Sequence, residues 1–335
     1  MTTVVTGAAG HVGANLVRAL ACAGRSVRAM VYRDRRALEG LAVEHAEAGI
    51  RDYDSVRRVC EGADTVFHLA SRISIVGGES GLVSATNVQG TANVTRACLE
   101  LGVRRLVHFG SVHGLEQGRR GEPICESNGP NESGAAGAYD RSKAEGVCVV
   151  AEAVAQGLDA VTVLPTAVLG PHDYKPSRMG RVLLDLYHRR LPAVTAGGFH
   201  WVDVRDVVAG ALAAEDCGRK GDTYLLSGEY LMVSELVSLV EEVTGIKRPR
   251  LVTPMWLARA AAPCALAWAR LRGKDPRFTP ESIRALRWNP LLSCAKAERD
   301  LDYRPRPIDE TIRDTFEWFG AMGWLEPGWR PSPWA

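Results

Sequence analysis

The sequence lacks the features that mark several specialised protein classes. None of its eight cysteines forms a C-x-x-C pair, which argues against a zinc ribbon or a thioredoxin-type site, and we predict no metal site. The formal charge is only +2, from 41 basic and 39 acidic residues. Binding to nucleic acid or to an anionic membrane by bulk electrostatics is therefore not predicted. No repeat at solenoid or propeller periods occurs.

A leader segment and a long apolar run are also missing. The chain opens directly with the strand-like run Met1–Thr6, without the basic and apolar regions of a signal peptide. We therefore expect a cytoplasmic protein whose cysteines are reduced, buried thiols. The best membrane candidate, Leu251–Leu271, contains Arg259, Pro254 and Pro263, so no span is predicted. An amphipathic or buried helix is expected there, with a surface lipid or substrate contact as the alternative.

What is present is typical of a globular α/β protein of about two domains. Hydrophobic residues make up 46% of the 335 and charged residues 24%, enough apolar material for a sizeable core. The pattern predicts strands at Thr2–Thr6, Ser26–Tyr32, Glu44–Ile50, Thr65–Ala70, Arg105–Gly110, Ala160–Pro165, His200–Val204 and Thr223–Ser227. It predicts helices at His11–Ala23, Asp34–Leu41, Asp54–Cys60, Leu82–Leu101, Tyr139–Gln156, Arg181–Arg190, Val207–Asp216 and Val233–Thr244.

The order of these elements predicts the fold class. Strands and helices alternate in the first half, and the strands are continuous apolar runs, as in a parallel sheet covered on both faces. We predict a Rossmann-type doubly wound parallel sheet with a smaller mixed C-terminal substrate lobe. The dinucleotide-binding part would span 1–170, with 202–227 returning to it. The lobe would take 171–201 and 228–325, and 326–335 would form a loosely held tail.

A glycine-rich turn follows the first strand and opens the first helix. Gly7 permits the tight turn, Gly10 lets backbone amides approach a pyrophosphate, and Gly13 lets the helix pack closely on the strand. The spacing is G-x-x-G-x-x-G, and its position at the first strand-to-helix junction favours dinucleotide binding over a purely structural turn. The helix N-terminus adds partial positive charge for the phosphates.

The end of the second strand bears on the choice of nicotinamide cofactor. Position 32 is Tyr32 rather than an acid that would bond a ribose 2′-hydroxyl, and Arg33, Arg35 and Arg36 follow. This favours NADP(H) over NAD(H), because a basic residue can accept a 2′-phosphate. The alternative is a solvated arginine-rich helix start, with Asp34 as its cap.

A tyrosine and a lysine four residues apart open a predicted helix. Tyr139 and Lys143 share one helical face. A phenol is a poor acid at neutral pH, and a nearby cation would lower its pKa enough for proton exchange with a carbonyl oxygen. Ser111, at the end of a strand, could hold that oxygen, although it could equally be a capping residue. His113 more simply packs or bonds locally.

These features occur together with further motifs, and the chain resembles the extended short-chain dehydrogenases/reductases. Within them it is most similar to the dihydroflavonol-reductase-like and 3β-hydroxysteroid-dehydrogenase-like members of the NAD-dependent epimerase/dehydratase superfamily. The resemblance covers most of 1–320. The motifs that carry it are Thr6–Gly13, Asp64–Ala70, Asn87–Thr91, Ser111, Tyr139-x-x-x-Lys143, Leu164–Pro171 and Trp201–Asp206.

The resemblance implies a role for each matching residue. Tyr139 would be the general acid/base, Ser111 would polarise the substrate carbonyl, and Lys143 would bond the nicotinamide ribose and lower the tyrosine pKa. Asn87 would support the helix and strand around the cofactor. The expected cofactor-binding residues are Thr6, Gly7, Ala9, Gly10, His11, Val12, Gly13, Tyr32, Arg33, Ile50, Leu69, Ala70, Ser71, Tyr139, Lys143, Pro165, Thr166 and Val168.

Departures from the family pattern narrow the substrate. Gly49 stands where an adenine-binding Asp is frequent, and Gly110 where a serine is frequent before the catalytic serine. His113-Gly114 replaces the Tyr-Gly of sugar-nucleotide enzymes, and Thr166-Ala167 stands where those enzymes tend to carry an Asn. These departures argue against a nucleotide-sugar substrate. Residues expected to line the substrate site are Arg72, His113, His172, Tyr174, Arg178 and Trp201.

The leading hypothesis is an NAD(P)(H)-dependent oxidoreductase that interconverts a ketone and a secondary alcohol on a small or partly apolar molecule. A nucleotide-sugar epimerase or dehydratase with tightly bound NAD is the alternative, with arginines at Arg178, Arg181, Arg189 and Arg190 for a diphosphate. A non-catalytic cofactor-sensing module is a third. Relatives imply a homodimer that pairs through the two long helices.

Overall fold

The computed structural model describes residues 1–335 except 119–120, 132, 134–135, 273–278, 288 and 332–335. A seven-stranded parallel sheet forms the larger part, with strand order β10-β6-β5-β4-β1-β2-β3. The strands are β1 (Thr2–Thr6), β2 (Ser26–Val31), β3 (Glu44–Glu47), β4 (Ala63–His68), β5 (Arg105–Phe109), β6 (Ala160–Pro165) and β10 (Thr223–Leu226). The order reverses beside β1, as in a doubly wound sheet.

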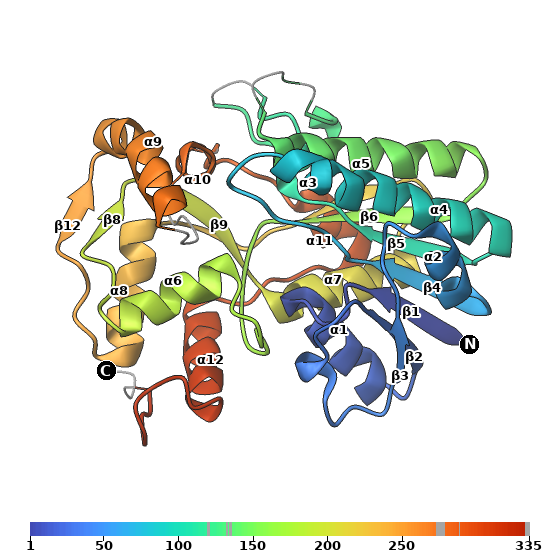
Figure 1. Ribbon diagram of the computed structural model, residues 1–335, viewed down its shortest axis with the longest axis horizontal. Helices are drawn as coiled ribbons and strands as arrows, with labels where there is room; N and C mark the ends of the chain where they lie inside the picture. Colours follow the sequence, from blue (N-terminus) through green and yellow to red (C-terminus); the bar gives the residue numbers. More distant parts are fainter. Residues whose placement is uncertain (119–120, 132, 134–135, 273–278, 288, 332–335) are drawn as a thin grey trace.

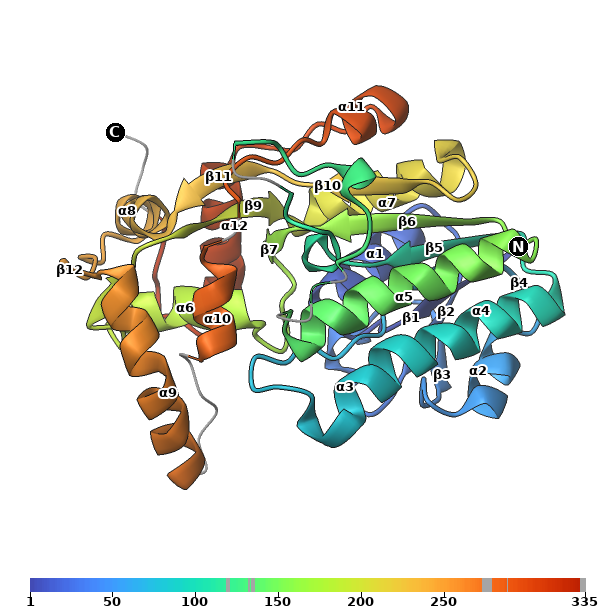
Figure 2. The ribbon, with the colours of Figure 1, turned by 90° about the horizontal axis from the view of Figure 1, so that it is seen from above.

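Helices cover both faces of this sheet (Figures 1 and 2). On one face lie α1 (His11–Cys22) and α7 (Val204–Cys217), whose apolar residues share one core with the sheet. On the other lie α2 (Tyr53–Cys60), α4 (Gly90–Leu101) and α5 (Ala138–Ala155), around a second core. Because both faces are buried, the central strands carry buried apolar side chains on both faces, together with buried polar residues such as Thr6 and His68. The predicted Rossmann-type α/β class is confirmed.

A smaller mixed lobe stands beside the carboxyl edge of the sheet (Figure 1). It contains a three-stranded sheet of β7 (Ala167–Leu169), β9 (Gly198–Asp203) and β11 (Glu229–Met232), and a β8–β12 pair (Ala193–Thr195 with Leu251–Thr253). Its helices are α6 (Arg178–Tyr187), α8 (Val233–Thr244), α9 (Met255–Leu271), α10 (Pro280–Ala285) and α12 (Ile308–Ala321). α6, α8 and α12 enclose a third core rich in aromatic rings. The short helix α11 (Ala295–Leu301) packs back on α7 and β10.

Two of the predicted helices are not continuous α-helices in the structure. Only the 3₁₀ turn Arg36–Leu38 forms within the predicted helix 34–41, because Asp34 accepts bonds from the amide and the guanidinium of Arg36 and Glu39 is extended. The predicted helix 82–101 begins as α3 (Leu82–Ser84), passes through a π turn at Ala85–Gln89 and continues as α4.

The predictions for the cysteines and the tail were wrong in part. Only Cys60 and Cys98 are buried, whereas four cysteines are exposed and two are half-buried, and all eight are free thiols. In the tail, Trp329 packs against Tyr187 and Phe316, so this part belongs to the third core. The last four residues lie outside the described part of the chain. No helix in the described part is long and apolar enough to cross a bilayer.

Candidate active site

The glycine turn joins β1 to α1 with very little space. Gly7 has φ +67°, and a Cβ there would meet the backbone of Ala70 at 2.8 Å. A Cβ on Gly13 would lie 2.2 Å from the carbonyl oxygen of Gly7. The turn and the first turn of α1 therefore contact each other directly. This places the helix N-terminus at the carboxyl edge of the sheet, where α/β proteins bind ligands.

The residues of the turn fit a dinucleotide. Gly10 is the N-cap of α1 and offers no side-chain bond to the first-turn amides, and a Cβ there would meet only the Gly7 oxygen, at 3.3 Å. The amides of the first turn make no bond to the described residues, so they and the helix dipole are free for a phosphate. Nearby, the Oγ1 of Thr166 is buried without a hydrogen-bond partner in the described part. A carboxamide or hydroxyl of a bound cofactor would satisfy it.

A chain of neutral hydrogen bonds fixes the end of β4 beside this turn. Thr6 Oγ1 accepts from the amides of Leu69 (3.1 Å) and Ala70 (3.2 Å), so its own proton points to His68 Nδ1 at 2.8 Å. His68 Nε2 then donates to Thr91 Oγ1 at 3.0 Å. Burial and the charge of Lys143 lower the pKa of His68 to about 3, so the ring stays neutral.

Asn87 ties three segments together. Its Oδ1 accepts from Ser71 Oγ (3.1 Å) and Arg72 N (2.7 Å) in the loop after β4. Its Nδ2 donates to Ser142 Oγ in α5 at 2.8 Å. The side chain sits on the π turn before α4, and it thereby fixes α5 relative to the β4 loop. Sequence reasoning missed Ser142, because no spacing rule distinguishes it from its neighbours.

Ser111, Tyr139 and Lys143 meet on one wall of a single cavity. Ser111 follows β5 and caps a 3₁₀ turn, where its Oγ accepts from the amide of His113 at 3.3 Å. Tyr139 and Lys143 come from the first two turns of α5 and are one helical turn apart. Lys143 is buried, and its Nζ donates to the carbonyl oxygen of Phe109 at 3.0 Å. Three groups that are far apart in sequence thus surround one space.

The proton affinities differ from the sequence-based expectation. Burial, together with the charge of Asp140, raises the pKa of Tyr139 to about 12, and a hydrogen bond with Ser111 opposes that rise. Burial lowers the pKa of Lys143 to about 8. The ammonium bonds the Phe109 carbonyl, and it does not depress the tyrosine pKa in the protein alone. Any acidification of Tyr139 has to come from groups that enter the cavity.

The segment after β2 leaves one arginine without an acidic partner. Asp34 pairs with Arg36, which lowers the Asp34 pKa to about 2, and Arg35 pairs with Glu47 at 2.8 Å. Arg33 lies instead over the ring of Tyr32, with its guanidinium carbon 5.0 Å from the ring centroid. Tyr32 is exposed and lies against Gly49. In the described part of this segment, Arg33 is the cation that remains for an anionic ligand.

The cavity has a volume of about 1400 Å³ and reaches from the glycine turn into the lobe. It joins most of the expected cofactor residues, though not Tyr32 or Arg33, to a mainly apolar wall in the lobe. Sequence reasoning did not identify this wall, because the lobe elements that form it carry no motif. Among the residues on this wall are Leu184, Leu191, Phe199, Leu236, Val237, Ile283, Leu286 and Leu292.

Most of the expected binding residues line the cavity, and a few lie behind it. Gly7, Gly10, His11, Val12, Gly13, Leu69, Ser71, Pro165, Thr166 and Val168 line it, as do His113, Arg178 and Trp201. Ala9 packs in the core, and Ile50 packs against Gly90. Arg72 pairs with Glu79 away from the cavity. His172 and Tyr174 also lie outside its lining: Tyr174 accepts from Arg18 and both rings pack on Trp318.

His11 and His113 have local partners. His11 Nε2 lies 3.1 Å from the carbonyl oxygens of Gly170 and Pro171, so the ring fastens α1 to the loop that enters the lobe. His113 Nδ1 lies 3.4 Å from Asp140 Oδ1, and its ring is 6.1 Å from that of Tyr139. At the edge of the site, His11 therefore holds the backbone at Gly170 and Pro171, and His113 lies against Asp140 and Tyr139.

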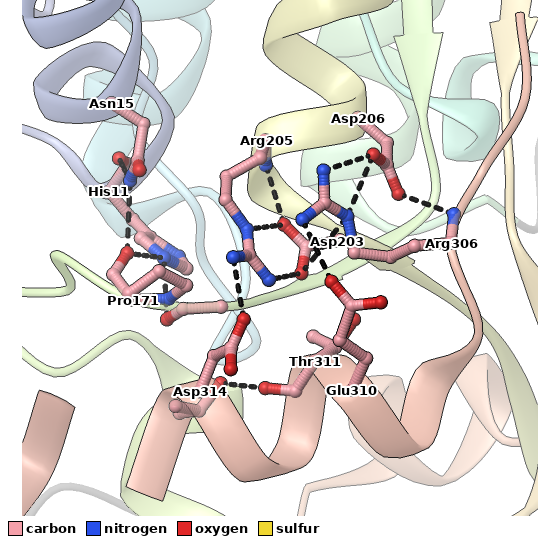
Figure 3. A network of polar contacts seen from close by, with 12 residues as sticks. His11, Asn15, Pro171, Asp203, Arg205, Asp206, Arg306, Glu310, Thr311 and Asp314 are labelled. Carbon is pink, nitrogen blue, oxygen red and sulfur yellow. Dashed lines mark hydrogen bonds and ion pairs between the residues drawn. The ribbon is translucent and has the colours of Figure 1, made fainter. Parts of the chain in front are cut away.

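A network of charges connects the sheet to the lobe (Figure 3). Asp203 is buried at the end of β9, where it caps α7 and receives two bonds from the Arg205 guanidinium, at 2.9 and 2.7 Å. Arg205 also reaches Asp314 in α12 at 2.6 Å. Arg306, just before α12, pairs with Asp206 at 2.9 Å. Burial would raise the pKa of Asp203, but its bonds with Arg205 hold that pKa below the ordinary value. The ion pairs of Arg205 with Asp314 and of Arg306 with Asp206 connect α7 to α12.

Residues 3–227 match the profile of the NAD dependent epimerase/dehydratase family. The chain belongs to this family. It is therefore an oxidoreductase of a nicotinamide-dependent group that includes epimerases, dehydratases and reductases.

Relatives agree with the sequence resemblance. The chain is 39% identical to sterol demethylase protein B of Methylococcus capsulatus, over 97% of this chain and the whole of that protein. It is 29% identical to a putative dihydroflavonol 4-reductase of Synechocystis, over 96% and 95% of the two chains. It is 27% identical to 3beta-hydroxysteroid-dehydrogenase/decarboxylase isoform 1 of Arabidopsis thaliana, over 84% and 67%. The crystal structure of gox2253 superposes with a TM-score of 0.84 at 31% identity, over 97% and 99%.

Proposed function

We propose that the protein is an NADP(H)-preferring oxidoreductase that interconverts a ketone and a secondary alcohol on an apolar, sterol-like molecule. One observation carries this proposal. Ser111, Tyr139 and Lys143 line the same cavity, which extends from the glycine turn into the lobe, where its lining is mainly apolar. The names of two relatives, a sterol demethylase protein and a hydroxysteroid dehydrogenase/decarboxylase, support the sterol-like class.

The residues divide the proposed chemistry between them. The bound cofactor supplies or accepts the hydride at the carbonyl carbon. Ser111 Oγ donates a hydrogen bond to the substrate oxygen, and the Tyr139 phenol donates the proton that converts that oxygen to a hydroxyl, or accepts it in the reverse direction. Lys143 would bond the cofactor ribose. With its cation closer to the phenol, the Tyr139 pKa would fall from about 12.

The cofactor preference rests on Arg33. Its guanidinium has no acidic partner in the described part of the segment, and it lies at the end of β2, where the 2′ position of an adenine ribose is bound in this fold. Tyr32 offers an exposed ring beside Gly49, in place of the family's acidic adenine contact.

The substrate class follows from the lobe. Leucine, isoleucine, valine and phenylalanine side chains make up much of the wall beyond Tyr139, and a polycyclic apolar molecule would remove this surface from water. A sugar diphosphate would make little use of this apolar surface and would depend on the arginines elsewhere in the lining.

The proposal is tested with Tyr139→Phe, assayed as NADPH oxidation with 3-ketosteroids. Loss of the proton donor should lower kcat by roughly 10²-fold or more, while NADPH binding persists. Tyr53→Phe is the matched control, because that phenol bonds Glu100 far from the cavity. Unchanged turnover in Tyr139→Phe would contradict the assigned proton transfer, and an enzyme that accepts no ketosteroid would contradict the substrate class.

A nucleotide-sugar epimerase is the second candidate, and one observation favours it. Arg178, Arg181 and Arg190 lie along the lining of the cavity, where a diphosphate could contact them. This reading predicts that the purified protein retains NAD and consumes no external NADPH. Release of the bound nucleotide by denaturation, followed by its quantification, separates the two functions.

A further inference from the structure

Helix α9 presents an apolar surface that the fold leaves uncovered. Four of its large side chains are exposed, Trp256 at 70%, Leu257 at 44%, Trp268 at 58% and Leu271 at 84%. On its inner side only a small cluster forms, in which Ala258 and Ala262 pack on Ile283 of α10. Figure 2 shows the helix projecting from the edge of the lobe. In most helices of this size the apolar face is the buried one.

The exposed residues form one continuous face. At about 100° per residue they occupy an arc of about 160°. The exposed residues in that arc are Trp256, Leu257, Ala260, Ala261, Pro263, Cys264, Ala267, Trp268 and Leu271, and none carries a charge. The preceding strand β12 adds Leu251 and Val252, which are also exposed. A monomer rarely exposes so many large apolar side chains together without a binding role.

The flanks of this face are basic. By the same helical spacing, the exposed Arg259 borders one side of the arc and Arg272 the other. Arg272 lies over the ring of Trp268, 4.1 Å from its centroid. From Arg250 to Arg272 the sequence contains four arginines and no acidic residue. The net charge of the whole chain is nearly balanced, so this excess of positive charge is local to α9 and the residues that flank it.

The same helix forms part of the cavity wall. Ala265, Trp268 and Arg272 line the cavity together with Ser282 and Ile283 of α10. The outer apolar face therefore continues, at Trp268, into the lining of the cavity that also contains Tyr139. An apolar molecule could pass from a lipid layer along Trp268 into the cavity without crossing bulk water.

We propose that α9 docks on the surface of an anionic lipid bilayer, lying in the plane of the headgroups with the mouth of the cavity toward the lipid. The apolar arc would enter the acyl boundary, the two tryptophans would lie at the interface, and the flanking arginines would contact anionic headgroups. The helix carries basic groups at both edges of its apolar arc, which matches an anionic lipid surface better than a second copy of this nearly neutral chain. The docking does not depend on the proposed reaction.

The experiment uses the full chain and vesicle flotation. Vesicles of phosphatidylcholine with about a third phosphatidylglycerol are compared with pure phosphatidylcholine vesicles, at low and high salt. The wild type should float with the anionic vesicles, should bind the neutral ones several-fold less, and should be released in part by high salt.

Two variants assign the binding to the helix. The double variant Trp256→Ser/Leu257→Ser removes outer side chains that do not line the cavity, and it should lower the floated fraction roughly tenfold. Met322→Ser, at an exposed methionine after α12, is its matched control. Arg259→Gln should weaken binding to the anionic vesicles alone, whereas Arg304→Gln, an exposed arginine elsewhere, should not. The melting temperature and cofactor binding of each variant show whether it folds.

Two results would overturn the proposal. The first is absence of flotation with either vesicle, or flotation that neither α9 variant reduces. The second is a wild-type dimer in light scattering that the double variant converts to a monomer, without vesicle binding, because α9 would then be covered by a second copy. If the double variant fails to fold, Arg259→Gln and the salt dependence decide the question. Vesicle binding with no turnover on any ketone would refute the proposed function and leave the docking intact.

Discussion

Gly13 provides a sharp test of how the turn and helix α1 are built. Replacing it with alanine puts a Cβ 2.2 Å from the Gly7 carbonyl oxygen and 3.0 Å from two atoms of Ala8, all of them backbone. Ordinary contact begins near 3.4 Å, so α1 and the turn have to separate by roughly 1 Å at a point where no flexible side chain can move instead. Gly13 is a first-turn helical residue, where alanine would otherwise be favoured by up to about 1 kcal/mol.

The steric clash and the higher helix propensity of alanine have opposite effects on stability, and the clash has the larger one. Overpacking of this kind costs about 1–3 kcal/mol, and sometimes more when backbone has to shift. We expect Gly13→Ala to lower the free energy of unfolding by about 1–2 kcal/mol, measured by urea denaturation without cofactor. It should also weaken cofactor binding, because the first-turn amides move with the helix.

Gly10→Ser is the matched variant, since its Cβ meets only one atom, at 3.3 Å. Serine is a favourable N-cap, so stability should change by less than about 0.5 kcal/mol. Cofactor affinity should still fall, measured by the fluorescence of bound NADPH, because the side chain lies in the path of the phosphates. Wild-type stability in Gly13→Ala, or wild-type affinity in Gly10→Ser, would refute this account of the turn.

Three further predictions concern charged side chains. Lys143→Met should abolish turnover yet raise the free energy of unfolding at pH 7 by roughly 1–2 kcal/mol. Burial lowers the Lys143 pKa to about 8, so the buried ammonium destabilises the folded state. Its bond to the Phe109 carbonyl offsets only part of that cost. Since the unfolded lysine binds its proton up to pH 10.5, the wild type should recover relative to the variant between pH 8 and 10.5; a constant difference across this range would contradict the buried ammonium. Arg306→Met removes the ion-pair partner of the buried Asp206 carboxylate and leaves it only the bond from the backbone amide of residue 306. It should destabilise the protein by about 1–3 kcal/mol in urea unfolding; a neutral effect would show that the network does not hold α12. Arg33→Ser should weaken NADPH binding roughly 10- to 100-fold and leave NADH binding unchanged, and equal losses for both cofactors would exclude a 2′-phosphate contact.

The larger sheet could be read from the sequence because burial on both faces leaves a simple pattern. Runs such as Ala160–Pro165 are apolar at every position except Thr162, and they recur at spacings that admit one helix between strands. Helix α8 was predicted at its observed bounds, Val233–Thr244, since one apolar stripe packs on the lobe core and polar residues face outward.

The start of α6 shows why other elements could not be predicted. The helix begins at Arg178, earlier than expected, because Ser177 caps it and Asp173 accepts from the Ser177 amide at 2.7 Å. Gly180 in its first turn looks like a helix breaker in the sequence. In the structure it is needed, because a Cβ there would lie 2.4 Å from the Asp173 carboxylate. The pairing of short strands such as β8 with β12 likewise depends on contacts distant in sequence.

The candidate catalytic residues could be named from the sequence, but their proton affinities could not. Spacing places Tyr139 and Lys143 on one helical face. It does not reveal that the Phe109 carbonyl takes the ammonium, or that burial raises the Tyr139 pKa to about 12. These effects depend on which backbone groups of a neighbouring strand end lie within reach, and no local pattern encodes that.

The position of β10 has a consequence for synthesis of the chain. This edge strand pairs with β6, yet in the sequence it follows α6 and β9, which belong to the lobe. The sheet therefore cannot be completed until residue 226 has been synthesised. Part of the lobe leaves the ribosome earlier, while the outer side of β6 is still unpaired. Ending the chain after residue 170 would leave β6 as an unpaired apolar edge strand, and such edges pair with strands of other molecules. We therefore expect the fragment 1–170 to aggregate when it is expressed alone.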